Sequence, residues 1–92
     1  GSGVQVVHFN ANWNSANDVK WVKNLTDCKV KSCDIATDTK AQSKFEIVVV
    51  PTIIIFNDGE EVKRFQADIS FAMKATEEEV QEKIDEILME GF

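Results

Sequence analysis

The sequence has few cysteines and no long apolar run, and both shortages exclude a class of protein. Its 92 residues include two cysteines, Cys28 and Cys33, which are too few for the disulfide scaffold of a small secreted protein. A reducing compartment, and hence a cytoplasmic location, is therefore expected. The longest apolar stretch, Ile47 to Phe56, is interrupted by Pro51 and Thr52 and falls short of the roughly 18 residues that a membrane span requires.

Positive charge is also scarce. Lysine and arginine number 10 against 16 aspartates and glutamates, so the net charge is -6. This balance argues against nucleic acid as a partner, because phosphate binding needs clustered cations. It fits a solvated acidic surface or, alternatively, a basic protein partner. One histidine and two cysteines at unsuitable spacing predict no zinc site, and no glycine-rich phosphate loop or other cofactor signal is visible.

The length predicts one domain, over residues 4–92, with Gly1-Ser2-Gly3 as a scar of cloning. Val4 to Phe9 is short and β-rich, which predicts a buried strand. Ser15 and Asp18 resemble a capping box that opens a helix. The apolar face of that helix would be formed by Val19, Val22 and Leu25.

The middle of the chain predicts three further strands and a short helix. The strands cover Val30 to Ile35, Thr52 to Phe56 and Glu61 to Gln66, and the helix covers about Lys40 to Phe45. The turn Asn57-Asp58-Gly59-Glu60 carries an Asp-Gly hairpin signal, so the last two strands should be antiparallel.

A second capping box, Thr76 with Glu79, opens the last predicted helix. Its apolar face would be Val80, Ile84, Ile87 and Leu88. The order is therefore β-α-β-α-β-β-α, with a parallel first pair of strands. An α/β fold with a four-stranded mixed sheet and helices on both faces follows.

Two segments of the chain resemble thioredoxin. The stretch from Trp13 to Asp18 follows a strand as the family's Trp-Cys-Gly-Pro-Cys-Lys does, and Val50-Pro51-Thr52 resembles the family's Ile-Pro-Thr. Between Val30 and Gln66 the resemblance runs without a gap, and it implies a cis peptide bond before Pro51. The chain resembles a thioredoxin-like domain that lacks the family's first strand and helix and carries an insertion from Asp68 to Ala75.

Asn14 and Asn17 stand where this family has its two redox cysteines. Thiol–disulfide exchange needs a thiolate and a resolving thiol, and asparagine supplies neither. The asparagines would either cap a helix or line a polar binding rim. In the family, the residue before the cis-proline offers its backbone to a bound peptide, a role that the resemblance gives to Val50. The predicted peptide groove consists of Trp13, Asn14, Asn17, Val50, Pro51 and Ala67.

The leading hypothesis is a redox-inactive thioredoxin-like domain, without catalytic residues, that recognises a protein or peptide. One alternative is an atypical thiol-disulfide oxidoreductase that uses Cys28, and another is a structural subdomain of a larger protein. Cys28 could be exposed, whereas Cys33 reads as a small core residue; if both lie on one extended strand, they are too far apart to pair.

His8 lies between Val7 and Phe9, which predicts a core histidine or, alternatively, a pH sensor. Trp21, Phe71 and Met73 would form an apolar patch that docks a partner or another copy of the chain, or that covers a sheet edge.

Overall fold

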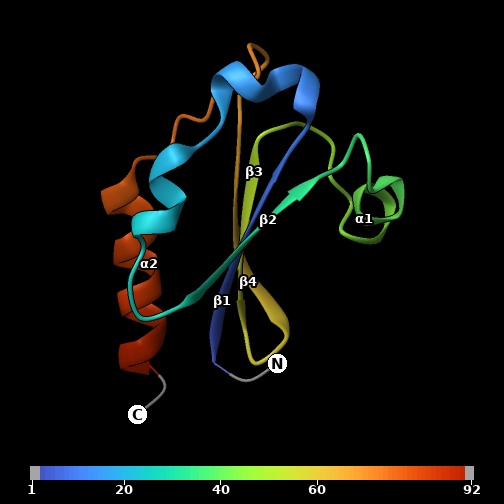
Figure 1. Cartoon of the computed structure of the whole chain (residues 1–92). Helices are drawn as coiled ribbons and strands as arrows, with labels where there is room; N and C mark the ends of the chain where they lie inside the picture. Colours follow the sequence, from blue (N-terminus) through green and yellow to red (C-terminus); the bar gives the residue numbers. More distant parts are fainter. Residues whose placement is uncertain (1–2, 91–92) are drawn as a thin grey trace.

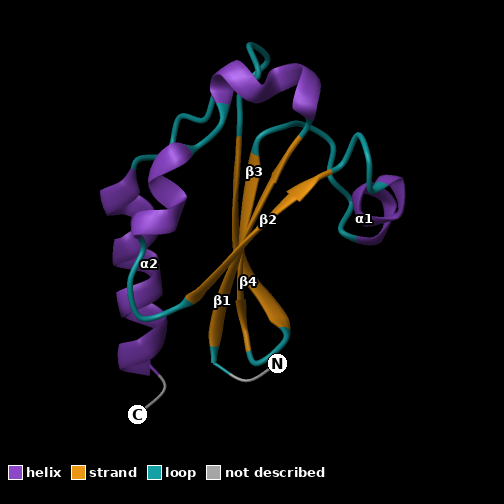
Figure 2. Ribbon diagram, viewed as in Figure 1, coloured by secondary structure: helices purple, strands orange, loops and turns teal. Residues whose placement is uncertain are grey.

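A four-stranded mixed sheet forms the centre of the computed structural model (Figures 1 and 2), with the strand order β2-β1-β3-β4. Strand β1 (Val4–Asn10) pairs in parallel with β2 (Lys29–Asp34) and antiparallel with β3 (Thr52–Asn57). Strand β4 (Glu60–Gln66) pairs antiparallel with β3. The mixed sheet expected from the sequence is confirmed.

The structure describes residues 3–90. Two residues of the predicted scar, Gly1 and Ser2, and the last two residues of the predicted domain lie outside this range.

The helices lie on both faces of the sheet, as predicted. Helix α1 (Thr39–Lys44) covers one face, and α2 (Glu77–Glu90) covers the other (Figure 1). Asp38 caps α1, because its side chain accepts a hydrogen bond of 3.2 Å from the Ala41 N–H. The predicted capping box of α2 is confirmed: Thr76 Oγ1 accepts from the Glu79 N–H and the Glu79 carboxylate accepts from the Thr76 N–H, each at 3.2 Å.

The helix predicted after Ser15 is wrong in its form. Two short 3₁₀ helices replace it, η1 (Asn12–Asn17) and η2 (Lys20–Asn24). Asn12, Asn14 and Asn17 are weak helix formers, because their side chains compete for backbone groups. The Asp18 side chain does not take part in the predicted capping box, because its carboxylate accepts a hydrogen bond from Asn10. The chain therefore bends between the two helices.

The alternation of side chains along the strands produces two core layers. In β3, Ile53 and Ile55 point toward α2 while Ile54 points toward α1, and all three are fully buried. The α2 layer also contains Val4, Val6, Val19, Val22, Leu25, Val80, Ile84 and Ile87. The α1 layer also contains Phe9, Ala11, Ile35, Ala41, Ile47 and Val50.

Helix α2 buries a narrower stripe than predicted. Val80, Ile84 and Ile87 are buried, but Leu88 is 37% exposed. At about 100° per residue, Leu88 lies about 80° around the helix from Val80 and so falls at the margin of the stripe. None of the helices within residues 3–90 is both long and apolar enough to cross a membrane.

Candidate functional site

Three asparagines form a hydrogen-bonded cluster where β1 ends and η1 begins. Asn10 Nδ2 donates to the backbone oxygen of Asn14 at 3.2 Å and to the carboxylate of Asp18. Asn14 Nδ2 donates to Asn10 Oδ1 at 3.1 Å, and Asn17 Nδ2 donates to Asn14 Oδ1 at 2.9 Å. The two residues that were compared with redox cysteines are thus joined by an amide–amide hydrogen bond.

Asn14 is 6% exposed and uses its whole side-chain amide. Its second amide proton goes to the backbone oxygen of Phe71 at 3.1 Å, across 57 residues of sequence. Because both protons and the oxygen are engaged, the buried amide is satisfied. Asn14 therefore ties η1 to the segment that precedes α2.

That segment, residues 67–75, runs beside η1 at one end of the sheet (Figure 1). The Phe71 ring meets the Trp13 ring edge-on, with centroids 5.4 Å apart. Asp68 shapes the turn: its carboxylate accepts from the Ser70 N–H at 2.8 Å and its carbonyl accepts from the Phe71 N–H at 3.0 Å. Hydrogen bonds to the carboxylate from the Ser70 hydroxyl and the Ser70 N–H, with Lys74 nearby, lower the pKa of Asp68 to about 2.

Val50 and Pro51 directly precede β3 at this end of the sheet and are joined by a cis peptide bond, as the resemblance implied. The Pro51 carbonyl accepts from the Ala67 N–H at 3.0 Å. Among residues 3–90, no hydrogen bond is formed by the backbone N–H or carbonyl of Val50. Both backbone groups of this buried residue are therefore unpaired within the described part of the chain.

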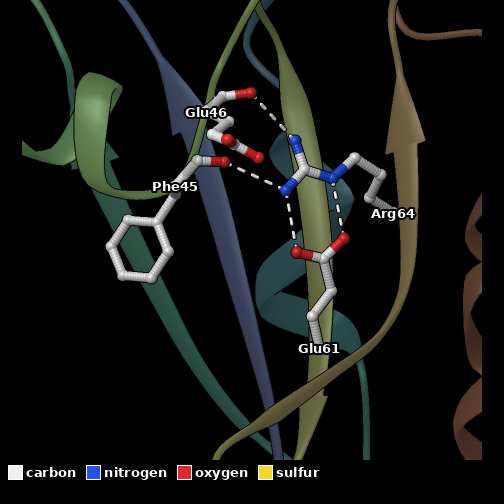
Figure 3. A network of polar contacts seen from close by, with 4 residues as sticks. All are labelled: Phe45, Glu46, Glu61 and Arg64. Atoms are coloured by element: carbon white, nitrogen blue, oxygen red, sulfur yellow. Dashed lines mark hydrogen bonds and ion pairs between the residues drawn. The ribbon is translucent and has the colours of Figure 1, made fainter.

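Arg64 holds the loop that leads to Val50 (Figure 3). Its guanidinium forms a two-pronged contact with the Glu61 carboxylate, with both N···O distances at 2.8 Å. The same group donates to the backbone oxygens of Phe45 and Glu46 at 3.0 and 3.1 Å. Arg64 thereby fastens the end of α1 to β4, and it fixes the start of the loop.

The six predicted groove residues lie at one end of the sheet but differ in exposure. Asn14, Val50 and Pro51 are buried, and Ala67 is half-buried. Asn17 is exposed, and Trp13 is 63% exposed. Phe71 at 41% and Ile69 at 97% extend the apolar surface beside Trp13. We call the side chains of Trp13, Asn17, Ile69 and Phe71 the Trp13 surface.

Comparison with solved structures shows which proteins share the fold of this chain. A mutant thioredoxin from Halobacterium salinarum, a poplar thioredoxin h and a thioredoxin from Fasciola hepatica superpose with TM-scores of 0.73, 0.71 and 0.67. They cover 92%, 95% and 92% of this chain and are 22%, 19% and 23% identical to it. The superposition uses 74%, 78% and 81% of those chains. The chain has a thioredoxin-like fold.

Thioredoxins from other organisms match part of this chain in sequence. Thioredoxins from Mycobacterium bovis and Mycobacterium tuberculosis are 41% identical over 42 residues, which is 46% of the chain. The match spans 36% of the length of these relatives. No family model matches.

The two cysteines of this chain are free thiols and do not form a disulfide bond with each other. Cys28 packs against the α2 layer and Cys33 against the α1 layer. Burial raises the pKa of both thiols, assisted by Asp27 at Cys28 and by Asp38 and Asp34 at Cys33. Raised pKa values keep the thiolate, which is the nucleophile, scarce at neutral pH. Within residues 3–90 no group of three or more His, Cys, Asp or Glu could hold a metal ion.

His8 is buried in β1, on the face that α2 covers. Its Nδ1 lies 3.4 Å from Ser32 Oγ, and its Nε2 has no hydrogen-bond partner among the described residues. Burial lowers the pKa of His8, and the nearby Asp18 carboxylate opposes this shift in part. The histidine is therefore kept neutral inside the fold.

Sequence reasoning missed Asn10, Asp18 and the Phe71 carbonyl as members of the site. The run of asparagines at positions 10, 12, 14 and 17 was an available signal, because short polar side chains that follow a strand closely in sequence can hydrogen-bond to one another and to nearby backbone groups. The apolar patch predicted from Trp21, Phe71 and Met73 does not form one surface. Trp21 and Met73 pack against the α2 layer, whereas Phe71 joins Trp13.

Proposed function

We propose that this chain is a redox-inactive thioredoxin-like domain that recognises a protein or peptide. The hydrogen bond between Asn17 and Asn14 carries the proposal, because it stands where thiol chemistry would need two cysteines. Neither amide has a titratable proton or a nucleophilic atom. The remaining thiols lie in different core layers with raised pKa values, which does not favour a reductase built on Cys28.

Recognition would use the Trp13 surface and the Val50 backbone. A largely exposed tryptophan beside an exposed isoleucine and a half-exposed phenylalanine offers large apolar contact area. Tryptophan is the residue most enriched among those that dominate binding energy. The partner would be a segment with apolar side chains, and the unpaired Val50 groups are suited to its main chain.

The experiment compares disulfide reduction and peptide binding. In an insulin-reduction assay driven by dithiothreitol, we expect neither the wild type nor a Cys28→Ser/Cys33→Ser variant to exceed the reductant alone. Turnover by the wild type that the double variant lacks would contradict redox inactivity.

For recognition, short random peptides displayed on phage are selected on the immobilised wild type. Trp13→Ser should weaken the selected peptides by about 2 kcal/mol, or roughly 30-fold in Kd. The control is Met89→Ser, since Met89 is 75% exposed and lies in the last turn of α2, outside the Trp13 surface. Equal losses in both variants, or no selectable peptide, would count against recognition at the Trp13 surface.

A further inference from the structure

Phe71 is held in a backbone conformation that bulky residues rarely adopt. Its φ is 63°, in the left-handed region, where the side chain of a residue other than glycine is crowded by its own backbone. Such a conformation persists only where the surrounding structure holds it, and it is found most often at functional sites such as ligand clamps and switch regions. The contacts that hold Phe71 therefore bear on what the residue does.

Three contacts hold Phe71, and two of them come from η1. Its N–H donates to the Asp68 carbonyl at 3.0 Å, which closes a tight turn. Its carbonyl accepts a hydrogen bond from the Asn14 amide at 3.1 Å, and its ring meets the Trp13 ring edge-on. The two contacts with η1 thus require a backbone carbonyl and an aromatic ring, which any peptide with an aromatic residue also carries.

Residues 68–72, which we call the tip loop, are closed on themselves and weakly tied to their surroundings. The Asp68 N–H donates to the Ala72 carbonyl at 3.3 Å. Apart from an ion pair of Asp68 with the neighbouring Lys74, the amide of Asn14 donates the one hydrogen bond that joins this loop to the rest of the described chain. The tip loop can therefore move away from η1 without breaking its own hydrogen bonds.

The two flanks of the tip loop are fixed and keep it close to η1. On one side, the Ala67 N–H donates to the Pro51 carbonyl at 3.0 Å. On the other side, Met73 and Ala75 pack against the α2 layer. A group that is tethered over a short distance competes at an effective concentration on the order of millimolar. A free peptide must therefore compete with the tip loop for the same two contacts.

We propose, on the basis of the proposed function, that Phe71 is a built-in competitor for the peptide that binds at the Trp13 surface, and that this peptide presents an aromatic residue. The aromatic ring of the partner would replace the Phe71 ring on Trp13. The backbone carbonyl of the same partner residue would accept the Asn14 amide in place of the Phe71 carbonyl. The exchange would let Phe71 leave its crowded conformation, so local strain favours release of the tip loop.

A fixed surface and an exchangeable one predict opposite effects of removing the Phe71 ring. If Phe71 were only part of the contact area, its loss would weaken peptide binding. If Phe71 is a competitor, its loss strengthens binding, because more of the protein then has Trp13 and Asn14 free for the peptide. Phe71→Gly is the suitable variant, since glycine adopts this φ without crowding.

The probe is a capped peptide with the sequence of residues 67–75, added to the protein and followed by amide NMR. It should bind Phe71→Gly with a Kd at least about tenfold lower than its Kd for the wild type. The resonances of the Asn14 side-chain amide and of the Trp13 indole N–H should shift. The control peptide has alanine in place of phenylalanine and should show no preference for the variant.

Ala72→Gly is the matched control variant. It adds similar backbone freedom one residue further along the tip loop, but it keeps the Phe71 ring and carbonyl. It should bind the probe as the wild type does. A gain in Ala72→Gly equal to that in Phe71→Gly would assign the effect to flexibility of the loop and would overturn the proposal.

Two further results would also overturn it. The first is binding of the probe to Phe71→Gly that is equal to or weaker than binding to the wild type. The second is saturation of the wild type by the probe while the Phe71 N–H resonance stays unshifted, which would mean binding without displacement. Phe71→Asn, which lacks the ring and tolerates the same φ, serves as the test variant if Phe71→Gly does not fold.

These outcomes are separate from those that test the proposed function. Peptides selected on phage that depend on Trp13 would still support recognition at the Trp13 surface, even where Phe71→Gly weakens their binding. In that case Phe71 is part of a fixed surface, and only its role as a competitor is wrong.

Discussion

Asn14 shows which features of the site could be predicted from the sequence and which could not. The resemblance of its position to that of a redox cysteine rests on the neighbouring Trp13, which is local in sequence. Its burial does not, because the Phe71 carbonyl that satisfies its amide lies 57 residues away. A tertiary partner of this kind leaves no local pattern, so the choice between a capping and a binding asparagine could not be made from the sequence.

The burial of the single residue His8 predicts how the stability of the chain depends on pH. Its pKa in the folded chain lies below the ordinary value of 6.5, because burial disfavours the cation. Below that pH the unfolded chain binds a proton that the folded chain refuses, so stability should fall as the pH drops. The loss should level off once the pH passes the lower, folded pKa.

Urea unfolding of the wild type and of His8→Phe, at about pH 7.5 and at about pH 5, measures this effect. The variant should lose less stability between the two conditions. Val48→Ala is the control, because this exposed side chain is changed while the imidazole and its Ser32 neighbour are kept, so the variant should follow the wild type. Equal pH dependence in His8→Phe and the wild type would show that other groups cause the acid sensitivity.

At the scale of elements, the strands and α2 were predictable and the 3₁₀ helices were not. Strands β3 and β4 are marked by an apolar run and an Asp-Gly turn, and α2 by a capping box and its apolar spacing. These signals are local. The bend between η1 and η2 depends on the hydrogen bond between Asn10 and Asp18, and a capping-box pattern at Ser15 gives no sign of it.

Arg64 gives the prediction that belongs to this scale, since it joins β4 to the loop after α1 (Figure 3). Arg64→Ala should lower the free energy of unfolding by about 1–2 kcal/mol, because charge-assisted hydrogen bonds to two carbonyls are lost from a partly exposed site. Arg64→Lys keeps the charge but not the fork, so it should recover less than half of the loss.

Comparison with Glu61→Gln shows whether the ion pair or the carbonyl contacts of Arg64 contribute more to the free energy of unfolding. Glu61 forms a surface ion pair, so its change should cost about 0.5 kcal/mol. If chemical denaturation gives equal costs for Glu61→Gln and Arg64→Ala, the ion pair dominates and the carbonyl contacts contribute little.

For the whole molecule, the two core layers share one thin sheet. Ile54 and Ile55 are adjacent, fully buried and chemically identical, yet they point into different layers. We predict that Ile54→Ala and Ile55→Ala each lower the free energy of unfolding by about 2–5 kcal/mol. Each variant should still show one cooperative transition, since a chain of this length is expected to form one domain.

Calorimetry and denaturation followed by two probes test this cooperativity. Val48→Ala is the control, because Val48 is 83% exposed and should change stability by less than about 0.5 kcal/mol. Two separated transitions in either isoleucine variant would mean that the layers fold independently, and the prediction of a single domain would then be wrong.

The hydrogen bond from Asn14 to Phe71 also bears on the history of the chain. A cysteine at position 14 could not supply the two amide protons that hold Asn10 and Phe71 together. A thiol placed there would therefore release the segment at 67–75 as well as add a nucleophile. Asparagine at position 14 and closure of the segment depend on each other, so we expect position 14 and this segment to change together among related chains.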